Sequence, residues 1–167
     1  MEVICPLGLF GDRKATIGIL DDDVKFIMTH GGCNLFAKIL SEKTGWKIYH
    51  VTLYETFENM TIPTGIHVVC KLPDGKFCDV EGIKTKEDLF SDYQKYMTDY
   101  MMSGSSLFPY IIDTGCWLTD YIFVCQNKRF IISPGSVDSV ADDESIKLLA
   151  ESVIENFVNS LNFSSKY

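Results

Sequence analysis

The sequence contains no long apolar run, no segment rich in proline, glycine or serine, and fewer basic than acidic residues. A helix that spans a bilayer needs about 20 consecutive apolar residues, so no membrane-spanning segment is predicted. Fifteen basic and 23 acidic residues give a net charge of −8, which disfavours nucleic acids and anionic membranes as partners. Because no linker divides the 167 residues, we expect a single domain, residues 1–167.

Motifs for cofactors and metals are also lacking. The chain has neither of the common glycine-rich phosphate-binding motifs, no C-x-x-C pair and no calcium-loop spacing among its carboxylates. The run Asp21-Asp22-Asp23 is more typical of a turn or a helix start than of a cation site. Cys70 and Cys78 are more typical of small apolar core residues than of zinc ligands. We therefore expect no cofactor and no metal.

The cysteines are scattered along the chain, and the N-terminus lacks the basic start and the apolar core of a signal peptide. Isolated cysteines without a secretion signal are typical of reduced thiols in the cytosol. We therefore predict a cytoplasmic protein whose cysteines are free. They are Cys5, Cys33, Cys70, Cys78, Cys116 and Cys125.

Apolar periodicity predicts helices and mainly antiparallel strands in one packed unit, which defines the α+β class. Residues 1–31 do not distinguish strand from helix, and Thr56–Thr64 is typical of a polar connection. Helices are predicted from Cys33 to about Lys43, after a Thr85–Asp88 cap, and from about Asp142 to Leu161, the last one amphipathic. Strands are predicted at Trp46–Leu53, Ile66–Leu72, Lys76–Val80, Phe108–Asp113, Tyr121–Gln126 and Arg129–Ser133.

The clearest hairpin turns at Pro73-Asp74-Gly75. A three-residue loop places Cys70 opposite Cys78, and it puts His67 and Asp79 on the same face of the two strands. A two-residue loop, which an Asp-Gly pair also suits, would put His67 and Asp79 on opposite faces. The positions of the proline and the glycine favour the three-residue loop.

Cys33 is the first candidate for chemistry, because it lies where a loop meets a helix. Gly31 and Gly32 let the backbone approach closely and leave the thiol uncovered. Unpaired N–H groups at a helix start favour a thiolate over a thiol, and they can also stabilise an oxyanion. The alternative interpretation is a small buried apolar residue, which is what most free cysteines are.

His67 is the candidate base for this thiol. It begins a strand of apolar residues, where a histidine is either a hydrogen-bonded core residue or the group that activates a nucleophile. Asp79 lies diagonally across the hairpin, at roughly 7 Å between backbones, within reach of a hydrogen bond to His67. Glu81 shares that face and is a rival, but the neighbours of Asp79 indicate deeper burial. His30 is a rival base, although a loop histidine is usually solvated.

Three segments, GGCNLFA (31–37), GIHVV (65–69) and DGKFCDVEG (74–82), resemble the papain-like cysteine hydrolases. The similarity covers about residues 30–83 and is nearest to short transglutaminase-like and bacterial or viral members. It implies a papain-like fold in which a helix carries Cys33 as nucleophile and packs on a mainly antiparallel sheet. It also implies His67 as general base and then acid, and Asp79 as the group that orients His67.

Two positions depart from that family pattern. Many members place a glutamine upstream of the cysteine to complete the oxyanion hole, whereas the glutamines here are Gln94 and Gln126. Candidates to supplement the Cys33 N–H are Asn34, Thr29 and His30. Asn34 also stands where relatives often have histidine or tryptophan.

The resemblance implies a cysteine hydrolase or acyl transferase, such as a peptidase, deamidase or transglutaminase. Such an enzyme would act on an amide or thioester-like carbonyl of a protein or peptide-like substrate. The alternative, favoured by the missing glutamine, is a non-catalytic protein-binding module on the same scaffold, for example a viral or host-directed inhibitor.

Overall fold

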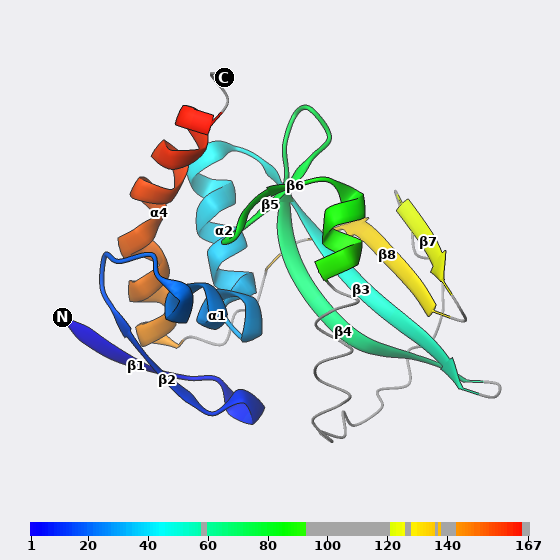
Figure 1. Ribbon diagram of the computed structural model, residues 1–167, viewed down its shortest axis with the longest axis horizontal. Coiled ribbons are helices and arrows are strands. Elements are labelled where there is room, and N and C mark those ends of the chain that lie inside the picture. Colours follow the sequence, from blue (N-terminus) through cyan, green and yellow to red (C-terminus); the bar gives the residue numbers. More distant parts are fainter. Residues whose placement is uncertain (58–59, 93–120, 126–127, 136, 138–142, 165–167) are drawn as a thin grey trace.

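The structure, a computed structural model, describes residues 1–57, 60–92, 121–125, 128–135, 137 and 143–164. These residues form an α+β fold, as predicted from the sequence (Figure 1). The strands are β1 (Glu2–Pro6), β2 (Asp12–Thr16), β3 (Lys47–Phe57), β4 (Met60–Lys71), β5 (Phe77–Asp79), β6 (Gly82–Lys84), β7 (Tyr121–Cys125) and β8 (Lys128–Pro134). The helices are α1 (Asp22–His30), α2 (Cys33–Thr44) and α4 (Glu144–Ser164), with a 3-10 turn η1 (Gly8–Phe10) and a further helix described over residues 86–92.

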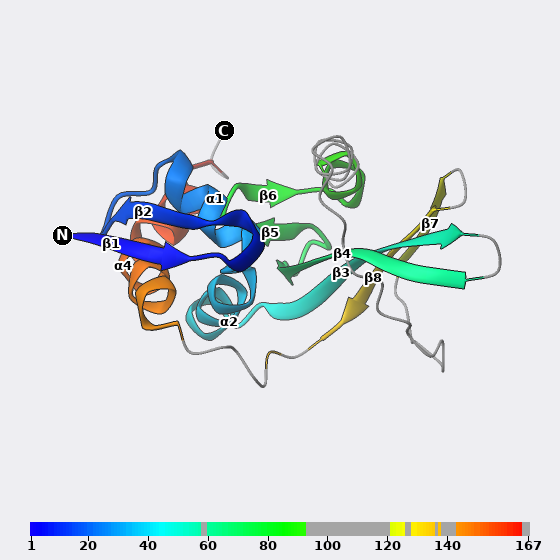
Figure 2. The same cartoon turned by 90° about the horizontal axis from the view of Figure 1, so that it is seen from below.

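The described strands form two antiparallel sheets. Six strands are paired in the order β6-β5-β4-β3-β8-β7, and β1 pairs with β2 separately. The far ends of β3 and β4 extend away from the helices (Figure 1). α2 packs against β4 on one side and α4 on the other, while the β1–β2 hairpin lies along α1 and α4 (Figure 2). The sheet therefore meets the helical layer mainly through α2.

Apolar clusters lie on both faces of the sheet. Along β4, Val68 points into the cluster formed with the helices, and Val69 points into a second cluster on the other face. Within the helical layer, Phe36 of α2 and Phe157 of α4 pack edge to face, with ring centroids 5.2 Å apart. Full burial of a side chain of this size stabilises the fold by about 2–3 kcal/mol. These contacts fix α2, and with it Cys33, against β4.

The ends of α2 follow from its sequence. The predicted helix begins at Cys33 as expected and ends at Thr44, one residue beyond the predicted Lys43. Gly45 adopts a left-handed conformation with φ 75°, which glycine tolerates best, and its N–H donates to Ser41 O at 2.8 Å. The predicted amphipathic C-terminal helix is confirmed as α4. Its apolar stripe is buried at Ile146, Leu149, Val153 and Phe157.

One predicted connection is wrong. Thr56–Thr64 was expected to be a polar loop, yet β3 continues to Phe57 and β4 already begins at Met60. Threonine is polar but β-branched, so a threonine-rich segment also suits an extended strand. Residues 1–31, whose sequence does not distinguish strand from helix, form β1, β2 and α1. The predicted strand Phe108–Asp113 lies outside the described residues.

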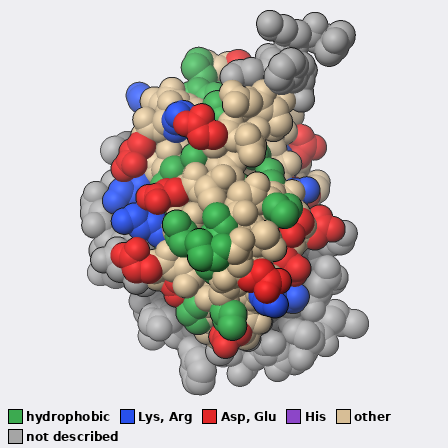
Figure 3. Space-filling model, turned by 90° about the vertical axis from the view of Figure 1, so that its left-hand side faces the viewer, with side chains coloured by type: hydrophobic (Ala, Val, Ile, Leu, Met, Phe, Trp, Pro, Cys, Tyr) green, Lys and Arg blue, Asp and Glu red, His purple; other side chains and the backbone are tan. Residues whose placement is uncertain are grey.

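The face that carries α4 and the β1–β2 hairpin bears acidic, basic and apolar side chains intermixed (Figure 3). On this hairpin, for example, Lys14 Nζ lies 2.6 Å from Glu2 Oε2. None of the helices in the described part of the chain has both the length and the apolar character that a bilayer crossing requires.

Candidate active site

Cys33 is the first residue of α2, which starts between α1 and α4. Gly32 caps this helix without a side-chain hydrogen bond, and its carbonyl accepts from Phe36 N at 2.9 Å. A Cβ at Gly32 would lie 2.9 Å from both Ile146 Cγ2 and Met28 Sδ, closer than these atoms can approach. A Cβ here would force these side chains or the start of α2 to shift, so glycine suits the tight approach beside the half-buried Cys33 thiol.

The Cys33 sulfur is held by one side chain and two backbone groups. It forms a hydrogen bond with the His67 ring, and the N–H groups of Asn34 and Val68 also donate to it. The β4–β5 ladder ends at the pair Cys70 and Cys78, so beyond this pair the edge of β4 is open to α2. The thiol thus lies where a helix start meets the end of a strand pairing.

Asp79 lies on the other side of His67. Its Oδ2 is 3.1 Å from His67 Nε2. The predicted three-residue loop is confirmed, since Cys70 pairs with Cys78 and the predicted hydrogen bond from His67 to Asp79 is present. Both side chains are buried, with Asp79 only 4% exposed. The three predicted residues therefore form one hydrogen-bonded chain.

The electrostatics of this chain favour a charged pair. Burial raises the pKa of the Cys33 thiol, but the hydrogen bond and positive charge of His67 outweigh burial and bring the pKa below its ordinary value. Burial lowers the pKa of His67, yet its bonds to Asp79 and Cys33 raise it overall. Burial raises the pKa of Asp79, but the hydrogen bonds and positive charges of His67 and Lys84 lower it by more. The pKa is therefore below its ordinary value, and the carboxyl stays ionised. These pKa shifts favour the thiolate of Cys33 and the imidazolium of His67 over the neutral pair.

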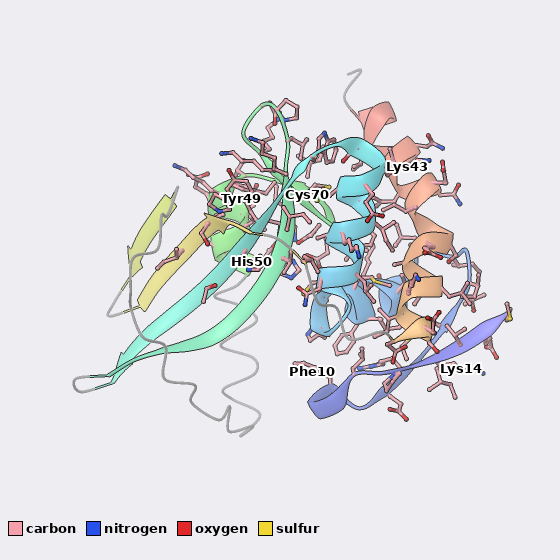
Figure 4. All side chains as sticks on the ribbon, turned by 180° about the vertical axis from the view of Figure 1, so that it is seen from behind. Phe10, Lys14, Lys43, Tyr49, His50 and Cys70 are labelled. Atoms are coloured by element: carbon pink, nitrogen blue, oxygen red, sulfur yellow. The ribbon has the colours of Figure 1, made fainter. Side chains whose placement is uncertain are left out.

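The pKa values of Cys5, Cys70 and Cys78 are shifted in the opposite direction. Burial raises the pKa of the Cys5 and Cys78 thiols, and it raises that of Cys70 to about 12. Cys70 lies where β4 faces α2 (Figure 4), and its Sγ donates to Ala37 O at 3.2 Å. These three are free thiols within the apolar core, as predicted for Cys70 and Cys78. No group of three potential metal ligands occurs among the described residues.

The rival residues have other contacts. The carboxylate of Glu81 contacts Lys84, while its backbone N–H donates to Asp79 Oδ1 at 2.9 Å. The His30 ring stacks on Phe26 with centroids 3.8 Å apart, and its Nδ1 bonds to Phe26 O at 3.0 Å. Glu81 therefore supports Asp79 through its backbone, and His30 is a packing residue of α1.

The candidate oxyanion donors Thr29 and Asn34 differ in the hydrogen bonds that they make in the structure. The Thr29 hydroxyl donates to Lys25 O and Phe26 O within α1, so it is not directed to the thiol. Asn34 contributes its backbone N–H to the sulfur. Of these candidates, Asn34 at the start of α2 is therefore the one shown to place a backbone N–H at the nucleophile.

Sequence reasoning missed Lys84, the last residue of β6. Its Nζ lies 3.1 Å from Asp79 Oδ2 and 2.8 Å from Asp92 Oδ2, and it also contacts the Glu81 carboxylate. A two-residue turn after Asp79 pairs that residue with Gly82, which puts Lys84 on the face of Asp79. That pattern was present, but three residues are too few to predict a strand.

Comparison of the chain with protein-family models, with curated proteins and with solved structures gives no match.

Proposed function

We propose that this protein is a papain-like cysteine hydrolase or acyl transferase, with Cys33 as nucleophile, His67 as general base and acid, and Asp79 as the orienting group. One observation carries the proposal: a hydrogen-bonded chain runs from Cys33 through His67 to Asp79 and lowers the pKa of this thiol alone among the described cysteines with shifted pKa values. A nucleophile, a base and a group that orients the base are the parts that thiol catalysis needs.

The order of the elements supports a papain-like arrangement. The cysteine begins a helix, and the histidine and the carboxylate follow on neighbouring antiparallel strands, β4 and β5. α2 packs directly against β4, which brings the helix start to the strand that carries His67. Residues 1–167 would then act as one catalytic domain.

The first half of the reaction forms an acyl-enzyme. His67 holds the proton of the Cys33 thiol, and the thiolate attacks the carbonyl carbon of an amide or thioester-like group in a protein or peptide-like substrate. The N–H groups at the start of α2, with that of Cys33 first, stabilise the oxyanion of the tetrahedral intermediate. His67 then protonates the leaving amine as the C–N bond breaks, and a Cys33 thioester remains.

The second half releases the acyl group. Water attacks the thioester while His67 accepts its proton, which gives a carboxylic acid and regenerates the thiol. An amine in place of water would give a new amide, which is the transglutaminase outcome. Asp79 holds the ring through Nε2 in both halves, so the imidazole keeps its orientation beside the sulfur.

Limited alkylation tests this proposal without a known substrate. Iodoacetamide is applied at neutral pH in small amounts, and mass spectrometry maps the modified cysteines. Cys33 should react first, because a thiolate reacts and a thiol does not. A Cys5→Ser variant is the matched control and should leave the labelling of Cys33 unchanged. If Cys70 or Cys78 reacts before Cys33 in the folded protein, the proposal is wrong.

A further inference from the structure

The Lys84 ammonium connects the candidate triad to two carboxylates outside it. The Lys84 side chain is 12% exposed, whereas those of Glu81 and Asp92 are 46% and 53% exposed. A lysine with so little exposure needs ionic partners, and these two half-exposed carboxylates already supply them. The third contact, to Asp79 Oδ2, joins Lys84 to the oxygen that also binds His67 Nε2.

The Asp79 carboxylate is held at both oxygens. Oδ2 accepts from His67 and Lys84, each at 3.1 Å, and Oδ1 accepts from Glu81 N at 2.9 Å. Three donors fix the plane of the carboxylate and hence the direction in which it holds the imidazole. When Cys33 is a thiolate and His67 an imidazolium, the charges alternate from Cys33 through His67 and Asp79 to Lys84, and the set is neutral.

We propose that Lys84 is a positioning residue of the Cys33–His67–Asp79 site: its ammonium fixes the Asp79 carboxylate that orients His67, and it balances the negative charge of the buried set. This inference rests on the proposed function, since it assigns Lys84 to the thiol-activating chain. Lys84 also ties that chain to the helix at residues 86–92 through Asp92.

The sign of the effect follows from Coulomb attraction. Removal of the Lys84 charge leaves the Cys33 thiolate in a more negative surrounding, so the thiolate forms at higher pH. Among the described residues, the charged groups that act on or respond to Lys84 include Asp79, Glu81, Asp88 and Asp92, all negative, and none of these can replace the lost cation. His67 is the cation facing the thiol, and the charges of His30 of α1 and His67 repel each other.

The test is the pH profile of Cys33 alkylation by iodoacetamide, measured by mass spectrometry from pH 4 to 9. In the Lys84→Met variant the midpoint of the profile should move to higher pH. At the wild-type midpoint the rate should fall about three-fold, while the plateau rate at high pH stays the same. Lys84→Arg keeps the positive charge, so the midpoint of its profile should lie close to the wild-type value. Lys76→Met is the matched control, since Lys76 pairs with Asp74 in the exposed turn at 3.3 Å.

A purely structural lysine would give a different result. Lys84→Met would then lower the melting temperature and leave the midpoint in place, and this outcome would overturn the inference. If Lys84→Met does not fold, the double variant Lys84→Met with Glu81→Gln keeps the net charge of the cluster, and its midpoint should move in the same direction but by less, because the buried Asp79 carboxylate loses its ammonium while the more exposed Glu81 charge is removed as well. A wild-type midpoint at the ordinary thiol value of about 8.5 would refute the proposed function itself rather than the role of Lys84.

Discussion

Cys70 lies directly opposite Cys78 across β4 and β5, and this pairing determines which side chains meet at the site. Because side chains alternate along a strand, His67 and Asp79 share the face opposite to that of the two cysteines. A shift of one residue in the pairing would move Asp79 to the face of the helices and leave His67 without its carboxylate. The turn between these strands therefore controls the geometry of the site.

We expect Gly75→Ala to destabilise the protein by about 1–2 kcal/mol, because φ at this position is 89° and a Cβ is disfavoured there. Gly75 N closes the turn by donating to Leu72 O at 3.0 Å. Urea unfolding followed by circular dichroism measures the loss. Asp74→Ala in the same exposed turn is the control and should cost only about 0.5–1 kcal/mol, through one hydrogen bond to Lys76 N. Equal losses in both variants would contradict the strain argument.

Gly32→Ala should destabilise the protein by about 1–3 kcal/mol and should also slow the alkylation of Cys33. A Cβ at this position would meet Ile146 Cγ2 and Met28 Sδ at 2.9 Å, so the start of α2 must shift away from α4. Thermal unfolding and labelling kinetics measure the two effects. An additional Ile146→Ala substitution removes one of the clashing atoms. The double variant should therefore be more stable than the sum of the single changes predicts.

The stability difference between wild type and Asp79→Asn should depend on pH. The pKa of Asp79 is lower in the folded than in the unfolded protein, so its contribution is fully present above the unfolded value of about 3.9. It is lost as pH falls through the folded pKa. Near pH 7 we expect the variant to be less stable by about 3 kcal/mol, since a buried partner of His67 is removed. The difference should shrink below pH 4, as measured by denaturant unfolding at each pH. A difference that stays constant down to pH 3 would contradict an ionised Asp79.

Local signals made much of this site predictable from the sequence. The end of α2 depends on Gly45, and the start of the helix at residues 86–92 depends on a reciprocal cap between Thr85 and Asp88, which the structure confirms. The hairpin register likewise depends on residues within the turn itself. In each case the residues that determine the local structure are close together in the chain, so their sequence pattern is enough to predict it.

What the sequence did not reveal depends on contacts between distant segments. β6 has only three residues and exists because it pairs with β5, so no periodicity can indicate it. The role of Lys84 depends on its ion pairs with Asp79 and Asp92, which lie on two different elements. The contact of Val68 N–H with the Cys33 sulfur needs a helix and a strand to be packed first. Such relationships arise from the tertiary fold and leave no local pattern.

The order in which triad substitutions act distinguishes an enzyme from a binding module. In a working triad the members act as a unit, so Cys33→Ser should abolish acylation of the protein by an activated thioester. His67→Ala should slow acylation by roughly a hundred-fold or more, since it removes the base. Asp79→Asn should slow it less, because the base remains and the N–H groups of Asn34 and Val68 still favour the thiolate.

Mass spectrometry of the acylated protein measures this series, and Cys70→Ala is its matched control. Cys70 is buried, and its thiol donates to Ala37 O, so its removal should leave the acylation rate unchanged while lowering stability. The same variants can be compared in cells without a known substrate. A phenotype that is lost in Cys33→Ser at an unchanged melting temperature requires the sulfur, because serine differs from cysteine by one atom. A phenotype that persists in stably folded Cys33→Ser would reject catalysis and support a protein-binding role for the same scaffold.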